Sequence, residues 1–160
     1  MHRHFIIIVF ILLIGIVSCK EASKKVKKTD NEETTTLKKE KPKGLQKGCY
    51  VYNTNRSTIS LQVTKLEDSV SGILLYALAE KDKNTGRFTG TLNNNILLAN
   101  YTFESEGKKS MRQIAFKVKN DTLIEGYGET TIQGNTRVFE DTSALEFTST
   151  FPLVKRDCIE

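Results

Sequence analysis

Residues 97–104 read LLANYTFE, and they set the pattern for the second half of the chain. Leu97, Ala99, Tyr101 and Phe103 alternate with Leu98, Asn100, Thr102 and Glu104. Apolar residues at every second position are typical of a half-buried β-strand. The same alternation occurs at 59–64, 114–119 and 145–151. Turn-forming clusters rich in Asn, Asp, Gly and Ser separate these stretches at intervals of about ten residues, which indicates an all-β sandwich or barrel.

The short links between the predicted strands favour pairing of each strand with its neighbour in sequence, an antiparallel meander. About eight strands fit residues 48–160, so we expect an up-and-down barrel of the lipocalin or streptavidin type. Glycines within the strand patterns, such as Gly72 and Gly90, are expected to mark bends in a curved sheet. Residues 72–83, GILLYALAEKDK, are apolar on both faces and then charged. We interpret 70–78 as a strand buried on both sides, with a short helix plugging the barrel as the alternative.

The N-terminus carries a secretory signal. His2, Arg3 and His4 precede thirteen apolar or glycine residues, FIIIVFILLIGIV at 5–17. This run is shorter than the ~20 residues that a membrane-spanning helix needs, and its length and flanks are typical of a signal peptide. Ile16-Val17-Ser18-Cys19 resembles the bacterial lipobox, which implies cleavage before Cys19 and attachment of lipid to its sulfur. An uncleaved anchor, or a chance cysteine after an ordinary signal, is the alternative.

A wider resemblance covers most of the chain. The segments EKDKNTGRFTG, YTFESEG and IEGYGE, together with the lysine-rich tether and the terminal cysteine pair, resemble a family of small, largely uncharacterised Bacteroidetes lipoproteins. Lys20 follows Cys19 where lipoproteins of the inner membrane often carry Asp. The resemblance therefore implies an outer-membrane lipoprotein that faces the periplasm or the cell surface.

Residues 19–47 form the predicted tether between the lipidated cysteine and the domain at 48–160. Between residues 20 and 47 there are ten lysines and five acids, with few large aliphatic residues. Such a composition buries too little apolar surface to offset the entropy of ordering, so we expect a disordered spacer. Residues 48–160 hold thirteen basic and fourteen acidic residues, so the chain's charge of +5 comes from the N-terminal part. This distribution argues against nucleic-acid binding, which requires a basic face on the folded domain.

Two cysteines lie at opposite ends of the domain. Cys49 opens it and Cys158 nearly closes it, and an exported chain with an even pair of thiols predicts a disulfide bond. In a closed meander the first and last strands must be neighbours. We therefore predict that the bridge joins the two strands that close the barrel.

The sequence excludes several chemistries. Both histidines, His2 and His4, lie in the signal peptide, so the mature chain cannot form a Ser-His or Cys-His nucleophile pair or a histidine zinc site. No glycine-rich phosphate loop and no calcium-loop motif occurs. We predict neither a cofactor nor a metal, and a protein that is not an enzyme. A hydrolase working through two carboxylates is the remaining enzymatic hypothesis, with four candidates: Glu104, Glu106, Glu125 and Glu129.

Four polar residues in or beside apolar strand patterns are candidates for ligand binding: Tyr76, Arg112, Glu125 and Tyr127. Polar groups that point into a barrel can orient a ligand, but they can equally satisfy one another or face water. The sequence thus favours a non-enzymatic envelope lipoprotein that binds a small ligand or a protein partner. An inhibitor of lysozyme or of a protease is the alternative, because Ser71-Gly72 with Tyr76 resembles the S-G-x-x-Y element of C-type lysozyme inhibitors. The tyrosine comes one residue late in that element.

Overall fold

A computed structural model describes residues 44–158 of the chain. The predicted signal peptide at 1–18, the lipidation site Cys19 and the tether up to residue 43 lie outside the described residues.

The described part of the chain is almost entirely β-structure, with one 3-10 turn, η1 (Thr142–Ala144). Its ten strands are β1 (Gly48–Asn53), β2 (Thr58–Leu66), β3 (Val70–Ala77), β4 (Asn84–Asn93), β5 (Ile96–Ser105), β6 (Lys108–Lys119), β7 (Thr122–Gly126), β8 (Thr130–Gln133), β9 (Thr136–Phe139) and β10 (Leu153–Arg156).

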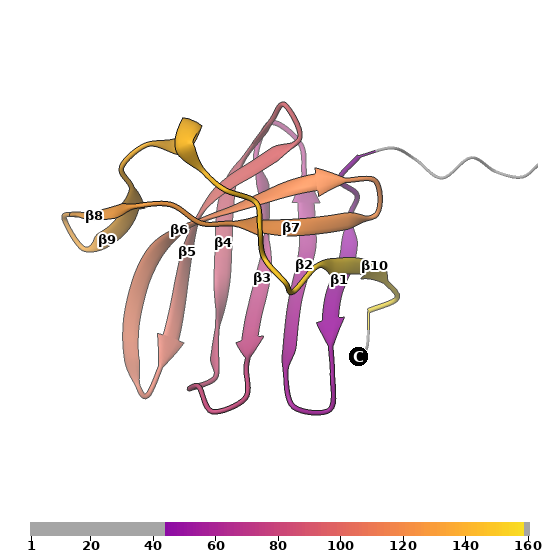
Figure 1. Ribbon diagram of the computed structural model, residues 1–160, viewed down its shortest axis with the longest axis horizontal. Helices are drawn as coiled ribbons and strands as arrows, with labels where there is room; N and C mark the ends of the chain where they lie inside the picture. The colour runs from indigo at the N-terminus through magenta and orange to yellow at the C-terminus, as the bar shows by residue number, and fades with distance from the viewer. Residues whose placement is uncertain (1–43, 159–160) are drawn as a thin grey trace, which may run out of the picture. The chain divides into compact units, whose positions relative to one another are not determined.

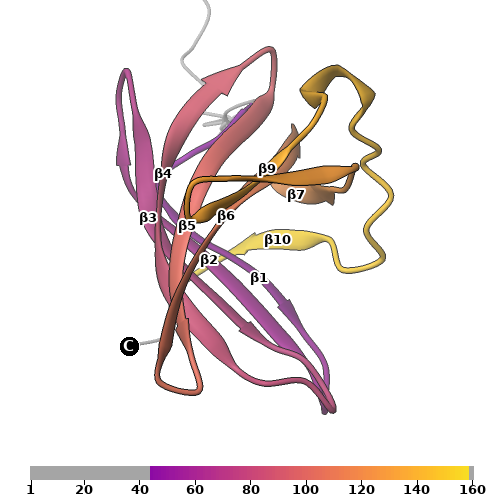
Figure 2. The ribbon, with the colours of Figure 1, turned by 90° about the vertical axis from the view of Figure 1, so that its left-hand side faces the viewer.

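Eight of these strands close into a barrel. The order is β1-β2-β3-β4-β5-β6-β7-β10, and β10 pairs with β1 to complete the ring. Every pairing in the ring is antiparallel. In Figure 1, β1 to β5 stand side by side while β7 and β10 cross in front of them, and Figure 2 shows β7 and β10 as the opposite wall. The predicted eight-strand, antiparallel barrel is therefore confirmed.

The chain leaves the meander once, between β7 and β10. β8 and β9 form a hairpin outside the ring, and β9 pairs in parallel with the first half of β6. The prediction of a strand over 145–151 was wrong. This segment is irregular and makes only one bridge, between Tyr127 and Glu146. Its alternating apolar residues serve another purpose, because Leu145 and Phe147 pack against the backbone of Gly128 and Gly126.

The strand expected at 70–78 is present as β3, and the helix considered for 72–83 does not form. Leu74 and Tyr76 of β3 point into the core. Gly72 allows β3 to lie close against β2, since a Cβ there would come within 1.8 Å of the carbonyl oxygen of Gln62. The glycine is needed for this close approach and not for an unusual backbone angle.

The interior of the barrel is filled by its own side chains. Residues that alternate along β2 and β5, including Leu61 and Leu97, are fully buried and belong to one continuous apolar cluster. Leu45 belongs to the same cluster, and the backbone N–H of Gln46 donates to the hydroxyl of Tyr50 at 2.8 Å. The packed part of the chain thus includes residues that the sequence analysis assigned to the tether.

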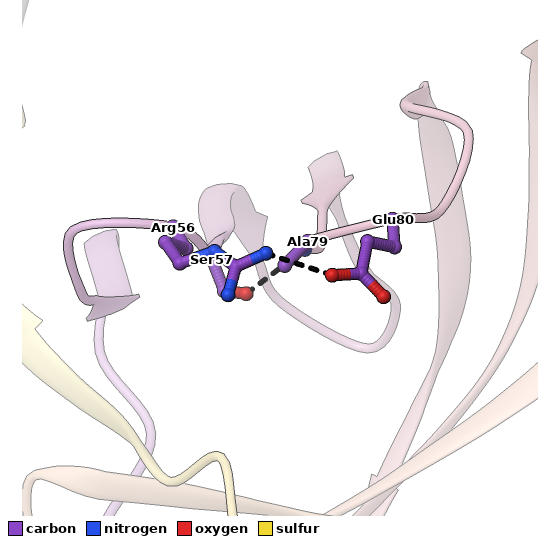
Figure 3. A network of polar contacts seen from close by, with 4 residues as sticks. All are labelled: Arg56, Ser57, Ala79 and Glu80. Atoms are coloured by element: carbon purple, nitrogen blue, oxygen red, sulfur yellow. Dashed lines mark hydrogen bonds and ion pairs between the residues drawn. The ribbon is translucent and has the colours of Figure 1, made fainter.

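Two loops are tied together at the end of the barrel where β1 and β3 finish (Figure 3). The guanidinium group of Arg56 lies 2.8 Å from the carboxylate of Glu80, and the backbone N–H of Ala79 donates to the Ser57 hydroxyl at 3.0 Å. Arg56 and Glu80 are exposed, so the ion pair contributes little, about 0–1 kcal/mol. The bond from Ala79 to Ser57 still fixes the loop after β3 against the turn between β1 and β2.

The predicted cysteine pair meets at the seam between β1 and β10. The sulfur atoms of Cys49 and Cys158 are 2.06 Å apart and their Cα atoms 5.2 Å apart, within the range for a disulfide bond. The two residues are 109 positions apart in the sequence. The bond therefore joins the beginning and the end of the domain beside the pairing that closes the ring.

Loss of this disulfide should lower the stability of the domain markedly. A loop of this length corresponds to a stabilisation of up to about 4–5 kcal/mol, because the crosslink restricts the unfolded chain. We expect a Cys49→Ala/Cys158→Ala variant to melt well below the parent, and dithiothreitol to lower the melting temperature of the parent only. Thermal unfolding followed by circular dichroism measures both, and a variant that melts with the oxidised parent would contradict the prediction.

Candidate functional site

Three of the four predicted ligand residues come from strands that meet at one end of the barrel. In the antiparallel ring β3 and β7 end where β6 begins, so Tyr76 near the end of β3, Glu125 near the end of β7 and Arg112 in the first half of β6 share this end. Tyr127 follows β7 directly. The strand topology therefore brings together residues that are separated by up to 51 positions.

Glu125 is the centre of this polar cluster. Its side chain is buried, and the Tyr76 hydroxyl donates to Oε1 of the carboxyl group at 2.6 Å. The hydroxyl of Tyr127 lies 3.4 Å from Oε2 and 3.2 Å from the hydroxyl of Ser149. Both oxygens of the carboxyl group thus have a phenol partner, which offsets part of the cost of burying it.

Arg112 lies against aromatic rings and not against a carboxylate. Its guanidinium carbon is 5.0 Å from the ring centre of Tyr76, 5.8 Å from that of Tyr101 and 5.7 Å from that of Phe103. Such cation–π contacts are worth about 0.5–2 kcal/mol each, more when desolvated. The Nε atom of Arg112 is buried and has no hydrogen-bond partner. Arg112 therefore enters the cluster with an unsatisfied donor.

The sequence analysis did not identify Tyr101 and Phe103 as parts of this cluster, although it placed both in a strand. Tyr101 is fully buried, and its hydroxyl donates to the carbonyl oxygen of Leu74 at 2.9 Å. Tyr101 and Arg112 are direct partners across β5 and β6. The turn signal at 106–108 would have allowed this register to be inferred, because a tight turn fixes which residues face each other.

A cavity of about 140 Å³ opens beside the cluster, where β7 ends and the β8–β9 hairpin begins. It is smaller than the ~300 Å³ that is the lower limit for pockets holding drug-sized ligands. Space of this size accommodates one functional group and not a large molecule. Its lining comprises Arg112, Gln113, Ile114, Glu125, Gly126, Tyr127, Gly128, Thr130, Arg137 and Phe139.

The walls of the cavity are built by the segments that follow β7. A Cβ on Gly126 would come within 2.6 Å of the Phe147 ring, so glycine there allows the irregular segment to cross over β7. Backbone N–H groups of Tyr127 and Glu146 donate to each other's carbonyl oxygens, both at 2.9 Å. The Phe139 N–H donates to the side-chain oxygen of Gln113 at 3.0 Å, which ties the end of β9 to β6.

Burial controls the protonation of the cluster. It raises the pKa of Glu125 above its usual value, and the hydrogen bond from Tyr76, the charge of Arg112 and the hydrogen bond from Tyr127 oppose the shift. Burial also raises the pKa of Tyr76 well above its usual value and that of Tyr101 to about 12. The phenols therefore stay protonated at neutral pH and act as hydrogen-bond donors, not as bases.

The four glutamates proposed for a hydrolase do not gather. Glu104 lines a groove on the outer face of β4 and β5, Glu129 lines a hollow beside η1, and Glu125 lines the cavity described above. Glu106 is exposed in the turn between β5 and β6. A glycosidase-type pair needs two carboxyl groups across one site, and no two of these four glutamates line the same one of these hollows.

The element that resembles lysozyme inhibitors, Ser71-Gly72 with Tyr76, lies in β3, which is part of the barrel wall. Tyr76 is 6% exposed and its hydroxyl is bonded to Glu125. The tyrosine of this element therefore faces the core, and an inhibitor function stays an untested alternative.

The chain was compared with known families and structures. No protein-family model, no curated protein and no solved structure matches it. Within residues 44–158 no helix has the length and apolarity to cross a membrane. Acidic, cysteine and histidine side chains of the same residues form no group of three or more suited to a metal ion.

Replacing Glu125 should change how stability depends on pH. A carboxyl group whose pKa is raised by folding stabilises the fold while it is protonated, and this contribution is lost as pH rises through the raised pKa. Glu125→Gln keeps a hydrogen-bond acceptor for Tyr76 without the charge. We expect the variant to gain stability relative to the parent as pH rises above about 4.3, the usual pKa of a glutamate side chain. Urea unfolding across this range measures the difference, and parallel pH profiles would contradict it.

Proposed function

We propose that this protein is an outer-membrane lipoprotein, anchored through Cys19, with a non-enzymatic binding role. Its partner is engaged at the polar end of the barrel. The observation that carries this proposal is the convergence of Tyr76, Arg112, Glu125 and Tyr127 beside one small cavity. Perturbed ionisable groups gathered at a cavity are a physical mark of functional sites.

The filled interior of the barrel limits the kinds of partner that the protein can bind. Barrels that carry apolar cargo, such as lipocalins, keep an open interior, whereas fully buried side chains such as Phe88 and Phe116 occupy this one. The proposed partner therefore presents a single polar group to the cavity and stays largely outside the barrel. A protein partner, or a small polar molecule, fits this requirement better than a lipid.

The anchor follows from the residues before the barrel. The apolar run at 5–17 and Ser18-Cys19 support lipid attachment, and the lysine-rich residues 20–43 separate that anchor from the barrel. Residence in the outer membrane rests on Lys20 and on the resemblance to Bacteroidetes lipoproteins. We make no proposal of an enzymatic activity.

Replacing the lipidated cysteine tests the anchor. Two or more acyl chains are needed for stable membrane attachment, so Cys19→Ala should move the protein from the membrane fraction to the soluble fraction. Metabolic labelling with palmitate should disappear in the same variant. Labelling that persists in Cys19→Ala would reject the lipoprotein proposal, and Cys49→Ala, in the same chain, controls for loss of a cysteine elsewhere.

Site-specific crosslinking in cells tests the binding role. A photoreactive amino acid at position 130 lies in the cavity wall, and the same group at position 68 lies in the exposed turn between β2 and β3. We expect a discrete adduct from position 130 only, and we expect Arg112→Gln to abolish it. The same adduct from both positions, or none from position 130, would contradict binding at this site.

A further inference from the structure

The cavity beside the polar cluster is lined by two arginines on neighbouring strands. Arg112 of β6 and Arg137 of β9 are direct partners in the parallel pairing of these strands. Neighbouring strands lie about 4.8 Å apart, and like charges at opposed positions destabilise a sheet. Both side chains also line the cavity. The fold therefore places two positive charges together at one small hollow.

Neither arginine is neutralised by a carboxylate in contact. The ion pairs found among residues 44–158 join Arg56 to Glu80 and Lys65 to Glu67, and neither involves Arg112 or Arg137. Arg137 donates to the Thr130 hydroxyl at 3.2 Å, and Arg112 lies over aromatic rings. Two guanidinium groups without a contacting acid leave several charge-assisted donors free for a ligand.

The one acid in the cavity wall does not cancel this charge. Burial raises the pKa of Glu125 above its usual value, and the two guanidinium groups outnumber this single carboxyl group even where it is ionised. The other ionisable groups around it are Tyr76 from β3, Tyr101 from β5 and Tyr127 after β7, all phenols with raised pKa values, besides the two arginines. The charge of the cavity is therefore positive whether Glu125 is ionised or protonated.

We propose that this cavity binds a carboxylate group, held between the guanidinium groups of Arg112 and Arg137. The planar fork of arginine matches the two oxygens of a carboxylate, and a cavity of about 140 Å³ holds one such group with a short stem. The carboxylate belongs to a free small acid or to the C-terminus of a peptide chain. The proposal rests on the binding role proposed above and names the chemical group that the site recognises.

An NMR titration of the ¹⁵N-labelled full chain in detergent micelles tests the assignment. The probe is butyrate, with butyramide as the uncharged control of the same shape. We expect butyrate to give saturable shifts at the amides of Gly126, Gly128 and Thr130, which line the cavity. Butyramide should give none. Shifts with both probes, or with neither, would overturn the carboxylate assignment.

Matched variants identify the residues that bind. Arg137 is exposed, so Arg137→Gln should fold normally and weaken butyrate binding by about tenfold or more, as expected for loss of a charge-assisted bond. Arg112→Gln should weaken it at least as much. Arg87→Gln, an exposed arginine on the outer face of β4, is the control and should change nothing. Equal affinity in the Arg137→Gln and Arg87→Gln proteins would overturn the proposal.

Two further probes separate the sources of the carboxylate. The first probe is a tripeptide with a free C-terminus. If it binds at least about tenfold tighter than butyrate, and its C-terminally amidated form does not bind, the carboxylate belongs to a peptide chain. Equal affinities assign it to a free small acid. Inorganic phosphate that binds more tightly than either probe would overturn the carboxylate assignment. A failed titration together with an intact crosslink at position 130 rejects the carboxylate and leaves the binding role standing.

Discussion

The pairing of β1 with β10 is the constraint on which the rest of the structure depends. It closes the ring, because without it both strands would be open edges of a curved sheet. The contact is short: β10 has four residues, of which three pair with β1 and two with β7. The disulfide between Cys49 and Cys158 lies beside this seam, and the Lys155 N–H donates to the carbonyl oxygen of Asp121 at 2.8 Å. A covalent bond thus reinforces one of the two shortest pairings in the ring.

β6 is much longer than β7, so part of β6 has no partner in β7. β6 has twelve residues and β7 only five, so β7 covers β6 only from Ala115 to Lys119. The first half of β6 pairs with β5 on one side, and β9 takes part of the other side. Backbone groups of a strand need partners, and the hairpin supplies some of them from outside the ring. The gap between the end of β7 and β9 is where the cavity forms.

The polar cluster at this gap is costly in stability. Leaving the buried Nε–H of Arg112 without an acceptor and burying the Glu125 carboxyl both oppose folding. Hydroxyl groups of Tyr76 and Tyr127, and the rings around Arg112, offset part of that cost. Most of the other buried side chains are aliphatic or aromatic, and they stabilise the fold without such groups. The domain thus retains the polar end at the expense of stability.

The sequence by itself determined the all-β class, the barrel and the two cysteines that meet at its seam. The alternation of apolar and polar residues with a period of two can be read from each segment by itself. A meander of about eight such strands can close into a barrel. Tyr76, Arg112, Glu125 and Tyr127 could be named because each interrupts an apolar pattern. Only the tertiary structure decided that they meet, that Tyr101 joins them and that Arg137 lies beside Arg112. These contacts depend on register and on the departure of the β8–β9 hairpin from the ring. The alternation at 145–151 led to a wrong strand prediction for the same reason. A period of two indicates which side chains face the protein, but it does not show whether the backbone pairs with another strand.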